Sequence, residues 1–186
     1  MKPSISKPNS KPKVLMIVEN AYPGDSRVRK EATALKELYD ITVISLKRNY
    51  QNWHEMVDGV EVIRVPEVAL PINSIRNRFI KFPVNVLNYA LQYSFFTTVS
   101  AGLFLLTYIR RRYKVIHAHN PPDTLFLVGL LGKLFSIKFV YDHHDLAPEL
   151  YLSRYSGKKG IPHKILMLCE KLSCKLADIV ISTNAS

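Results

Sequence analysis

Two clusters of polar and titratable residues are the parts of this sequence best suited to chemistry, and each follows a short apolar segment. The first cluster is His117, His119, Asn120 and Asp123, and the second is Asp142, His143, His144 and Asp145. Imidazole and carboxylate groups suit a divalent metal ion such as manganese, or another ligand that they hydrogen-bond. Because ligands of open parallel α/β sheets bind beyond the carboxyl ends of the strands, the two clusters predict one site.

The second cluster, the segment DHHD, places four titratable residues in succession. Such residues cost free energy to hold together unless they are solvated, hydrogen-bonded to one another or bound to a ligand. Side chains alternate in direction along an extended segment, so we expect Asp142 and His144 on one face and His143 and Asp145 on the other. At most half of this cluster then faces a single crevice.

In the first cluster, structural and functional interpretations divide the residues. Asp123 follows a pair of prolines, and we expect its side chain to cap the helix that begins there. His117 fits equally well as a hydrogen-bonded histidine between the sheet and that helix. His119 and Asn120 stand at the tip of the predicted strand, and they are the better candidates for contact with a ligand.

A third candidate site is the turn after the first predicted strand, ENAYPGDSRVRK. Gly24 lies in this turn, Asp25 or Ser26 can cap the following helix, and Arg27 lies in its first turn. The N-terminus of a helix attracts anions, so a phosphate site is one interpretation, and a solvated basic helix start is the other. A dinucleotide-binding fingerprint is excluded, because it needs three glycines and this segment has one.

These residues must be positioned by strands and helices that the hydrophobic pattern predicts. Apolar runs indicate strands over 14–18, 41–46, 60–65, 115–119, 138–141 and 178–183, and amphipathic patterns indicate helices over 26–38, 124–135 and 163–177. The segment 60–65 alternates and precedes Pro66, as is typical of an edge strand. The pattern predicts an α/β fold, a Rossmann-like doubly wound parallel sheet over residues 14–186. The composition of residues 1–13 predicts a disordered basic tail.

A long uncharged segment, residues 82–109, precedes the basic run RRRYK. Its length and flanking charges fit a transmembrane helix, which needs about 20 apolar residues. Its first half is amphipathic, however, with an apolar stripe of Val84, Leu87, Leu91, Phe95, Val99 and Leu103. A span would also place the strands before it and after it on opposite sides of the membrane. We therefore expect a helix that packs on the sheet and lies on an anionic membrane surface.

The formal net charge of +11 and the isoelectric point near 9.7 predict a polyanionic partner. Anionic lipid, nucleic acid and a phosphorylated substrate all fit, and charge alone does not choose among them. The two cysteines, Cys169 and Cys174, cannot form a structural zinc site by themselves. We expect them to be free thiols in a reducing compartment. The N-terminal residues lack the apolar core of a secretory signal.

The segment YLSRYSGKKG, after the second cluster, is expected to be a flexible loop that could close over a ligand, because Gly157 and Gly160 flank two lysines. The sequence stops directly after the strand predicted over 178–183. We therefore expect it to be the front part of a longer protein.

Six segments, taken in order, resemble the N-terminal domain of a GT-B fold retaining glycosyltransferase of the glycosyltransferase family 4 (group 1) type. They are KVLMIVENAYPGDSRVRKEATAL, ITVISL, VEVIRVP, YKVIHAHNPPD, KFVYDHHDLAPELY and CKLADIVISTN. The resemblance covers roughly residues 13–184 and rests on the order and spacing of these segments rather than on one motif.

The resemblance implies a two-domain enzyme that moves a sugar from a nucleotide-sugar donor to an acceptor, in a cleft between an acceptor-binding front domain and a donor-binding rear domain. It implies that His144, in the Y-D-x-H-D/E-x-x-P-E pattern, lies beside the donor sugar and stabilises the transition state. It places Gly24, Asp25 and Arg27 near the donor phosphates. The residues expected on the acceptor side or in the cleft are His119, Asn120, Asp145 and Glu149.

The resemblance implies no metal and no other cofactor. The first turn has one glycine where family members often have two, and the rear domain is absent from the sequence, so we expect this chain to be inactive alone. The expected partners are a nucleotide-sugar donor, a lipid-linked or polysaccharide acceptor, an anionic membrane surface and a donor-binding domain or subunit, but no nucleic acid. The expected location is cytoplasmic, peripheral at the inner face of the membrane.

Two other functions fit parts of the sequence. HNPPD followed by DHH resembles the DHH phosphoesterase family, in which His119, Asp123, Asp142 and His143 would bind manganese. That family needs a further aspartate-bearing strand between the two motifs, and this sequence lacks it. The third interpretation is a non-catalytic accessory module that is recruited to the membrane.

Overall fold

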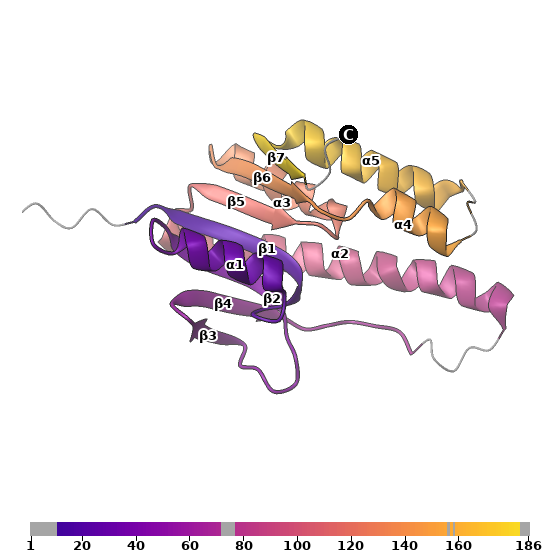
Figure 1. The fold of residues 1–186 in the computed structure, drawn as a ribbon, viewed down its shortest axis with the longest axis horizontal. Helices are drawn as coiled ribbons and strands as arrows, with labels where there is room; N and C mark the ends of the chain where they lie inside the picture. Colours follow the sequence, from indigo (N-terminus) through magenta and orange to yellow (C-terminus); the bar gives the residue numbers. More distant parts are fainter. Residues whose placement is uncertain (1–10, 72–76, 156, 158, 183–186) are drawn as a thin grey trace, which may run out of the picture.

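The fold is a seven-stranded sheet with helices on both faces (Figure 1). The computed structural model describes residues 11–71, 77–155, 157 and 159–182, apart from the side chains of 78–80. The strands lie in the order β3-β4-β2-β1-β5-β6-β7, and all neighbouring pairs are parallel except β3 with β4. The predicted α/β class and Rossmann-like doubly wound sheet are confirmed.

The predicted strands and helices occur in the predicted order, and β3 and α4 are additional to them. The strands are β1 (Lys13–Ala21), β2 (Asp40–Leu46), β3 (His54–Val57), β4 (Val60–Val65), β5 (Val115–His119), β6 (Lys138–His143) and β7 (Ile179–Ser182). The helices are α1 (Ser26–Leu35), α2 (Arg78–Arg111), α3 (Phe126–Leu134), α4 (Ala147–Arg154) and α5 (Ile161–Leu176), and a 3-10 turn, η2 (Asp123–Leu125), precedes α3. β1 runs past its predicted end, which brings the residues after Val18 to the edge of the site.

The sequence prediction missed β3 and therefore misplaced β4. Asp58 and Gly59 join the two strands with φ angles of 51° and 81°. Positive φ at both positions is what the two-residue type I′ hairpin turn requires. β3 is the outer strand and β4 pairs with β2 on its other side, so the prediction that 60–65 is an edge strand is wrong.

The central strand β1 is held from both faces of the sheet, because successive side chains point in opposite directions. Val14 and Met16 pack with α1, whereas Leu15 and Ile17 belong to the larger core cluster with α2 and α3. All four side chains are at most 4% exposed. Burial of an apolar side chain of this size contributes about 1.5–3 kcal/mol. The carboxyl end of β1 is therefore fixed between two packed layers.

α2 is 34 residues long and packs against α3 and the sheet, but its first half does not bury the predicted stripe. Leu87 and Leu91 are 53% and 43% exposed. Asn88 is buried instead, and its Oδ1 accepts a hydrogen bond from the backbone N–H of Leu70. The second half follows the prediction, with Phe95, Val99 and Leu103 packed on the core.

Among the described residues, α2 is the one helix that is long and apolar enough to cross a membrane, over Lys81–Arg111. Only 22% of its most apolar window is buried. β1 precedes α2 in the chain and β5 follows it, and the two strands pair in parallel from Val14 with Val115 to Val18 with His119. A membrane-spanning α2 would separate these paired strands and is incompatible with this sheet.

α3 packs directly on the sheet at two residues that lack a side chain. A Cβ atom on Gly129 would lie 2.7 Å from the ring of Phe139, and one on Gly132 would lie 2.5 Å from Cδ1 of Ile116. Both distances are shorter than a carbon–carbon contact allows. These glycines therefore set the spacing between α3 and strands β5 and β6.

The prediction of a flexible loop after the second cluster is wrong for the first part of that segment, because residues up to Arg154 belong to α4. Pro148 opens this helix, where its missing N–H costs nothing, and Tyr151 is buried. Ser156 and Lys158 of the predicted loop lie outside the described residues, as do residues 1–10 of the predicted tail and residue 183 of the predicted last strand.

Candidate functional site

The two polar clusters and the turn after β1 meet in one pocket of about 310 Å³ beyond the carboxyl ends of β1, β5 and β6. We call it the polar pocket. Its lining includes Glu19, Asp25, Arg27, Asn120, His144 and Asp145. The site-forming edge of the sheet is therefore the one that the strand-end rule predicts.

His144 is held from below by a buried carboxylate. Its Nδ1 lies 2.8 Å from Oδ1 of Asp142, whose other oxygen, Oδ2, lies 3.0 Å from Nδ1 of His119. Asp142 is fully buried, and although burial opposes ionisation, hydrogen bonds and charge from His119 and His144 lower its pKa to about 2. With Nδ1 engaged, Nε2 is the nitrogen that His144, 26% exposed, can present to the pocket.

His119 lies behind the pocket rather than in its lining. It is fully buried, and its ring lies 4.2 Å from the ring of His117. Burial, helped by the charge of His119, lowers the pKa of His117 to about 3, so His117 is neutral at pH 7. Glu31 of α1 completes the group, with Oε2 3.9 Å from Nε2 of His117 and 3.8 Å from Nδ1 of His119, and burial raises its pKa.

Glu31, His117, His119 and Asp142 have ligand atoms within 4.8 Å of one another, so by residue type they could hold a divalent cation. A protein cation already occupies one side of this group, because Nε of Arg27 lies 3.5 Å from Oδ2 of Asp142. The four ligands of the phosphoesterase interpretation are not assembled. His119 and Asp142 lie together, whereas Asp123 and His143 bind other partners.

Asn120 fixes the loop that carries His144. Its Oδ1 accepts hydrogen bonds from the backbone N–H groups of His144 at 2.7 Å and Asp145 at 3.0 Å. Its Nδ2 donates to the carbonyl of Asp145 at 2.6 Å and to Oδ1 of Asp123 at 3.1 Å. Asn120 is 1% exposed, so in this structure it holds the pocket wall in place rather than extending into the pocket.

The prediction that Asp123 caps the following helix is wrong. Its Oδ1 accepts a hydrogen bond of 2.5 Å from the hydroxyl of Tyr141, and the cap position before η2 has no side-chain hydrogen bond. Burial raises the pKa of Asp123, against the effect of its hydrogen bonds from Tyr141 and Asn120. Asp123 therefore ties the turn after β5 to strand β6.

His143 turns away from the polar pocket, as alternation predicts. It stacks on Tyr141, and its Nε2 lies 3.3 Å from Oε2 of Glu170 on α5. Asp145 was expected on the same face as His143, but it lines the polar pocket with His144, because β6 ends at His143 and alternation ends with it. Glu149 is exposed in the first turn of α4 and is not in the lining of the described pockets.

The turn after β1 supplies the positive charge of the pocket through a side chain. Asp25 caps α1 by accepting from the backbone N–H groups of Arg27 at 3.1 Å and Val28 at 3.2 Å, so these amides are not free for an anion. Gly24 suits this turn, because a Cβ there would lie 3.0 Å from the carbonyl oxygen of Ala21, a tight contact. The guanidinium of Arg27 lines the pocket and lies 4.0 Å from Asp25 and 3.5 Å from Asp142.

Glu19 is a pocket residue that the sequence prediction missed, because the strand was expected to end at Val18. Burial, with a smaller contribution from the charge of Glu67, raises its pKa to about 7. The signal that could have found it is its place directly after a continuous apolar strand, the same signal that identified the two clusters.

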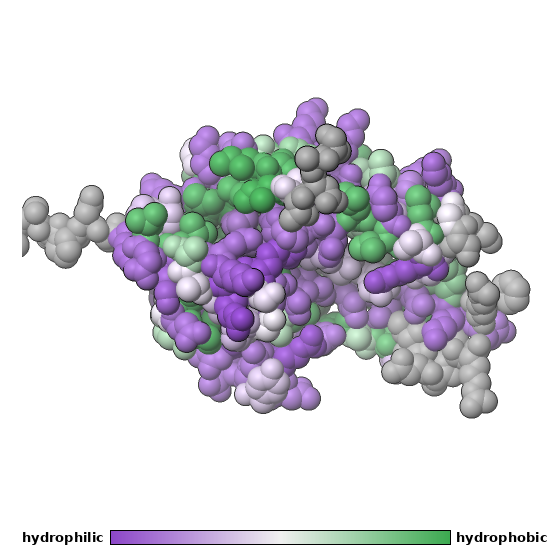
Figure 2. All heavy atoms as spheres, in the orientation of Figure 1, coloured by the Kyte–Doolittle hydropathy of each residue, from purple (hydrophilic) through white to green (hydrophobic). Residues whose placement is uncertain are grey.

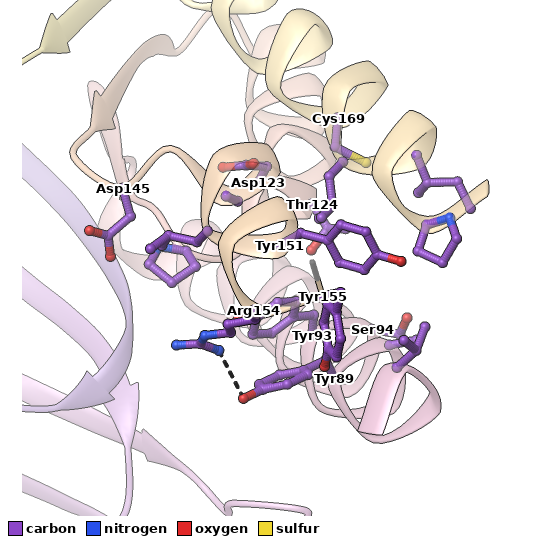
Figure 3. A pocket seen from close by; sticks show the side chains of 18 residues that line it. Tyr89, Tyr93, Ser94, Asp123, Thr124, Asp145, Tyr151, Arg154, Tyr155 and Cys169 are labelled. Carbon is purple, nitrogen blue, oxygen red and sulfur yellow. Dashed lines mark hydrogen bonds between the residues drawn. The ribbon is translucent and has the colours of Figure 1, made fainter. Parts of the chain in front are cut away.

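A second pocket, which we call the tyrosine pocket, lies between α2, η2, α4 and α5 (Figure 3). Its volume is about 380 Å³, and its walls include Tyr89, Tyr93, Tyr151 and Tyr155. It shares Pro121 and Asp145 with the polar pocket, so the two are adjacent. The sequence prediction did not anticipate it.

Comparisons with known proteins agree with this fold. Sucrose-phosphate synthase from Thermosynechococcus elongatus is similar with a TM-score of 0.53 and 17% identity, over 91% of this chain and 42% of that chain. LpCGTa, determined in complex with UDP, is similar with a TM-score of 0.53 and 13% identity, over 94% of this chain and 47% of that chain. At these identities the likeness shows the fold, and this chain spans less than half the length of either protein. No curated protein matches the sequence.

The sequence itself matches the family described as glycosyl transferase 4-like domain over residues 25–186. This match begins at the residue that caps α1 and includes both polar clusters. It confirms the resemblance to the N-terminal domain of a GT-B glycosyltransferase. The chain belongs to the glycosyl transferase 4-like domain family.

Proposed function

We propose that this chain is the acceptor-side part of a retaining glycosyltransferase, and that the sugar and diphosphate of a nucleotide-sugar donor meet it at the polar pocket. Family membership supports glycosyl transfer in general. The observation that carries the finer proposal is the geometry of His144. Its Nδ1 is held at 2.8 Å by buried Asp142, which leaves Nε2 for the pocket beside Arg27.

In the proposed reaction, the bond between the anomeric carbon and the diphosphate breaks, and its electron pair leaves with the diphosphate. The oxygen of an acceptor hydroxyl forms the new bond to that carbon, and the proton of the hydroxyl passes to an oxygen of the departing diphosphate. Arg27 and His144 stabilise the negative charge that develops on the leaving group. One positioned hydrogen-bond donor of this kind contributes a factor of about 10²–10³ in rate.

We propose that transfer needs no metal and no other cofactor. The support is that Arg27 supplies positive charge next to Asp142 and that both oxygens of this carboxylate already bind imidazoles. Transfer is expected to persist in EDTA. Stoichiometric manganese in the purified protein, with phosphoester hydrolysis that EDTA abolishes, would instead support the phosphoesterase interpretation.

A donor-binding domain, in the same polypeptide or in a partner subunit, is proposed to complete the cleft. The support is that the chain covers only 42% and 47% of the two similar solved structures. The test is release of nucleoside diphosphate from a panel of nucleotide sugars, measured with the chain alone and with the polypeptide that carries the second domain. Release is expected only with both parts, and transfer by the chain alone would contradict this part of the proposal.

Peripheral binding to the cytoplasmic face of an anionic membrane is proposed from α2. Its end exposes Leu106 and Ile109, each 70% exposed, next to Arg110 and Arg112. Apolar residues beside basic ones fit the interface of an anionic bilayer. Arg111 differs from its neighbours, because it forms an ion pair with Glu61. A cytoplasmic location agrees with the two free cysteines.

Sedimentation with phosphatidylserine-containing vesicles tests this membrane proposal. The double variant Arg110→Gln and Arg112→Gln is expected to lose binding at low salt. The matched control is the double variant Arg29→Gln and Lys30→Gln on α1, which removes the same charge from the opposite face of the sheet. Equal loss in both variants would show that net charge alone, and not the end of α2, directs binding.

A further inference from the structure

The tyrosine pocket offers a ligand many carbon atoms and few hydrogen-bonding groups. Its walls combine tyrosine rings with aliphatic side chains from three helices, including Val86, Leu150 and Ile165. The hydroxyl of Thr124, at its base, is already bonded to Thr97 at 2.7 Å. A sugar ring would place its hydroxyls against a wall that is mainly carbon, whereas an apolar chain gives up no hydrogen bonds there. The chemistry of the walls therefore favours an apolar chain.

The apolar surface continues from inside the pocket to the outside of the molecule. Leu150 and Ile165 line the pocket and are also 42% and 55% exposed. Further along α5, Ile161 and Leu168 are 76% and 54% exposed. Figure 2 shows apolar side chains around the α4 and α5 side of the molecule, next to the hydrophilic centre. A chain longer than the pocket can therefore continue along α5.

One end of the pocket carries the opposite chemistry. Nη1 of Arg154 donates to the hydroxyl of Tyr89 at 3.1 Å, and in Figure 3 its guanidinium and Asp145 point to the same side, away from the tyrosine rings. This is the side of the polar pocket, because Asp145 lines both pockets. An accessible guanidinium beside an apolar pocket suits a phosphate group.

We propose that the tyrosine pocket binds the apolar chain of an amphiphilic acceptor, with the phosphate of that acceptor at Arg154 and its reacting end toward Asp145. The ligand class is an isoprenoid or alkyl chain that bears a phosphate. The pocket volume of about 380 Å³ is within the usual range for small-molecule sites, roughly 300–1,000 Å³. The acceptor role of this ligand rests on the proposed function, whereas the binding of the ligand does not.

The test is calorimetric binding of two probes, farnesyl phosphate and dodecyl phosphate, below their micelle concentrations. They share a phosphate and differ in chain type, so their relative affinities distinguish an isoprenoid source from an alkyl one. Inorganic phosphate and farnesol are the controls for head group and chain. We expect at least one phosphate-bearing probe to bind more tightly than both controls. Absence of binding by both probes would overturn the proposal.

A paired substitution on α2 locates the site. Ala90 lines the pocket and is exposed, so Ala90→Trp fills the pocket without disturbing the core. Thr98→Trp adds the same side chain at an exposed position on α2 outside the lining. We expect Ala90→Trp to weaken probe binding by about tenfold, because it keeps about two methylene groups of the probe from contact with an apolar wall. Thr98→Trp should leave probe binding unchanged.

A second variant, Ile165→Asp, places a charge in the exposed part of the apolar wall and is expected to weaken binding without unfolding the protein. Arg154→Gln should reduce the affinity for farnesyl phosphate toward that for farnesol. Equal binding to wild type and Ala90→Trp would overturn the proposal, as would a soluble oligosaccharide that displaces the probe. Binding needs neither donor nor transfer. Probe binding without sugar transfer by the chain together with its donor-binding domain would refute the proposed function alone, and transfer that Ala90→Trp does not affect would refute this inference alone.

Discussion

The polar pocket and the tyrosine pocket lie next to each other and share Pro121 and Asp145, yet they are held in different ways. Behind the polar pocket, buried Asp142 binds two imidazoles, and Asn120 fixes the backbone of the loop that carries His144. The walls of the tyrosine pocket are rings from separate helices, in contacts such as that of Tyr151 with Tyr155, 4.8 Å between centroids.

This difference predicts different responses to change. In a buried polar network, loss of one partner leaves another group unpaired, so the effect spreads beyond the altered residue. In a pocket walled by rings from separate helices, each side chain contributes its own contact area. Substitutions behind the polar pocket should therefore affect folding and function together, whereas substitutions in the tyrosine pocket should affect ligand binding alone.

The largest effect is expected for Asp142→Asn. Removing one member of a buried charged group typically costs about 3–5 kcal/mol, and we expect the lower end because Arg27 is partly exposed. The pKa of Asp142 lies near 2 in the folded protein, below the ordinary value of 3.8. Its contribution is therefore present above about pH 4 and lost as the pH falls toward 2.

Urea unfolding at pH 7 and at pH 3 measures both parts of this prediction. Asp40→Asn is the control, because Asp40 is exposed and its ion pair with Lys13 is 4.0 Å long. The control should change the free energy of unfolding by less than about 0.5 kcal/mol. A similar loss in both variants would remove the distinction between the buried network and the surface.

His144→Ala is expected to separate function from folding within the polar pocket. Sugar transfer should fall by about 10²–10³, the usual effect of losing one donor to a developing anion. The free energy of unfolding should change by less than about 1 kcal/mol, because His144 is partly exposed. The measurement is release of nucleoside diphosphate by the protein with its donor-binding domain.

His143→Ala is the matched control, since His143 is adjacent in sequence but pairs with Glu170 on the other side of β6. It should retain transfer within about threefold, an effect of about 0.6 kcal/mol. If the two variants lost activity equally, the assignment of His144 to the reacting centre would fail.

A smaller effect is expected from Glu19, which gives the polar pocket a pH dependence that the tyrosine pocket should lack. With a pKa of about 7, Glu19 is neutral at pH 6 and ionised at pH 8, where it repels a bound diphosphate. From pH 6 to pH 8, the affinity of the wild type for pyrophosphate should fall about fivefold more than the affinity of Glu19→Gln. This difference corresponds to roughly 1 kcal/mol. Calorimetry at both pH values compares the wild type with that variant.

Glu37→Gln is the control for this titration, because Glu37 is an exposed carboxylate after α1 and outside the polar pocket. It should keep the pH dependence of the wild type. The same pH dependence in wild type and Glu19→Gln would mean that Glu19 does not sense the bound anion.

The smallest effect is expected for Tyr89→Phe in the tyrosine pocket. It removes the hydroxyl that accepts from Arg154 at 3.1 Å, at an exposed site. The free energy of unfolding should change by less than about 0.5 kcal/mol, as is usual for exposed polar contacts. Thermal or urea unfolding measures it. A loss as large as that of Asp142→Asn would show that the tyrosine pocket is a coupled network as well.

The sequence was sufficient for the parts of the fold that depend on local pattern. Continuous apolar runs identified the parallel strands, and the strand-end rule brought His144 and Arg27 to one pocket. The hairpin of β3 and β4 was missed although its signal, the dipeptide Asp58-Gly59, was present in the sequence. Glu31 was also missed, although its spacing of four from Arg27 places both on one face of α1.

Other features could not be predicted because they depend on contacts between distant segments. The tyrosine pocket takes its walls from four stretches between Val86 and Cys169, and none of them indicates a pocket by itself. The buried stripe of α2 was predicted wrongly at Leu87 and Leu91 because the first half of this helix buries hydrogen-bonded Asn88 instead. Tertiary partners, not periodicity, decide which face of such a helix is inside.

The close packing of α3 on the sheet limits which positions of this domain can vary in sequence. Gly129 and Gly132 leave no room for even one methyl group, so sequence variation there is restricted, and η2, at the base of the tyrosine pocket, stays at a fixed height above β5 and β6. The α2 and α5 walls are bounded by solvent and can accept larger or smaller side chains. Directed evolution of acceptor preference should therefore accumulate substitutions on α2 and α5 and leave the α3 glycines unchanged.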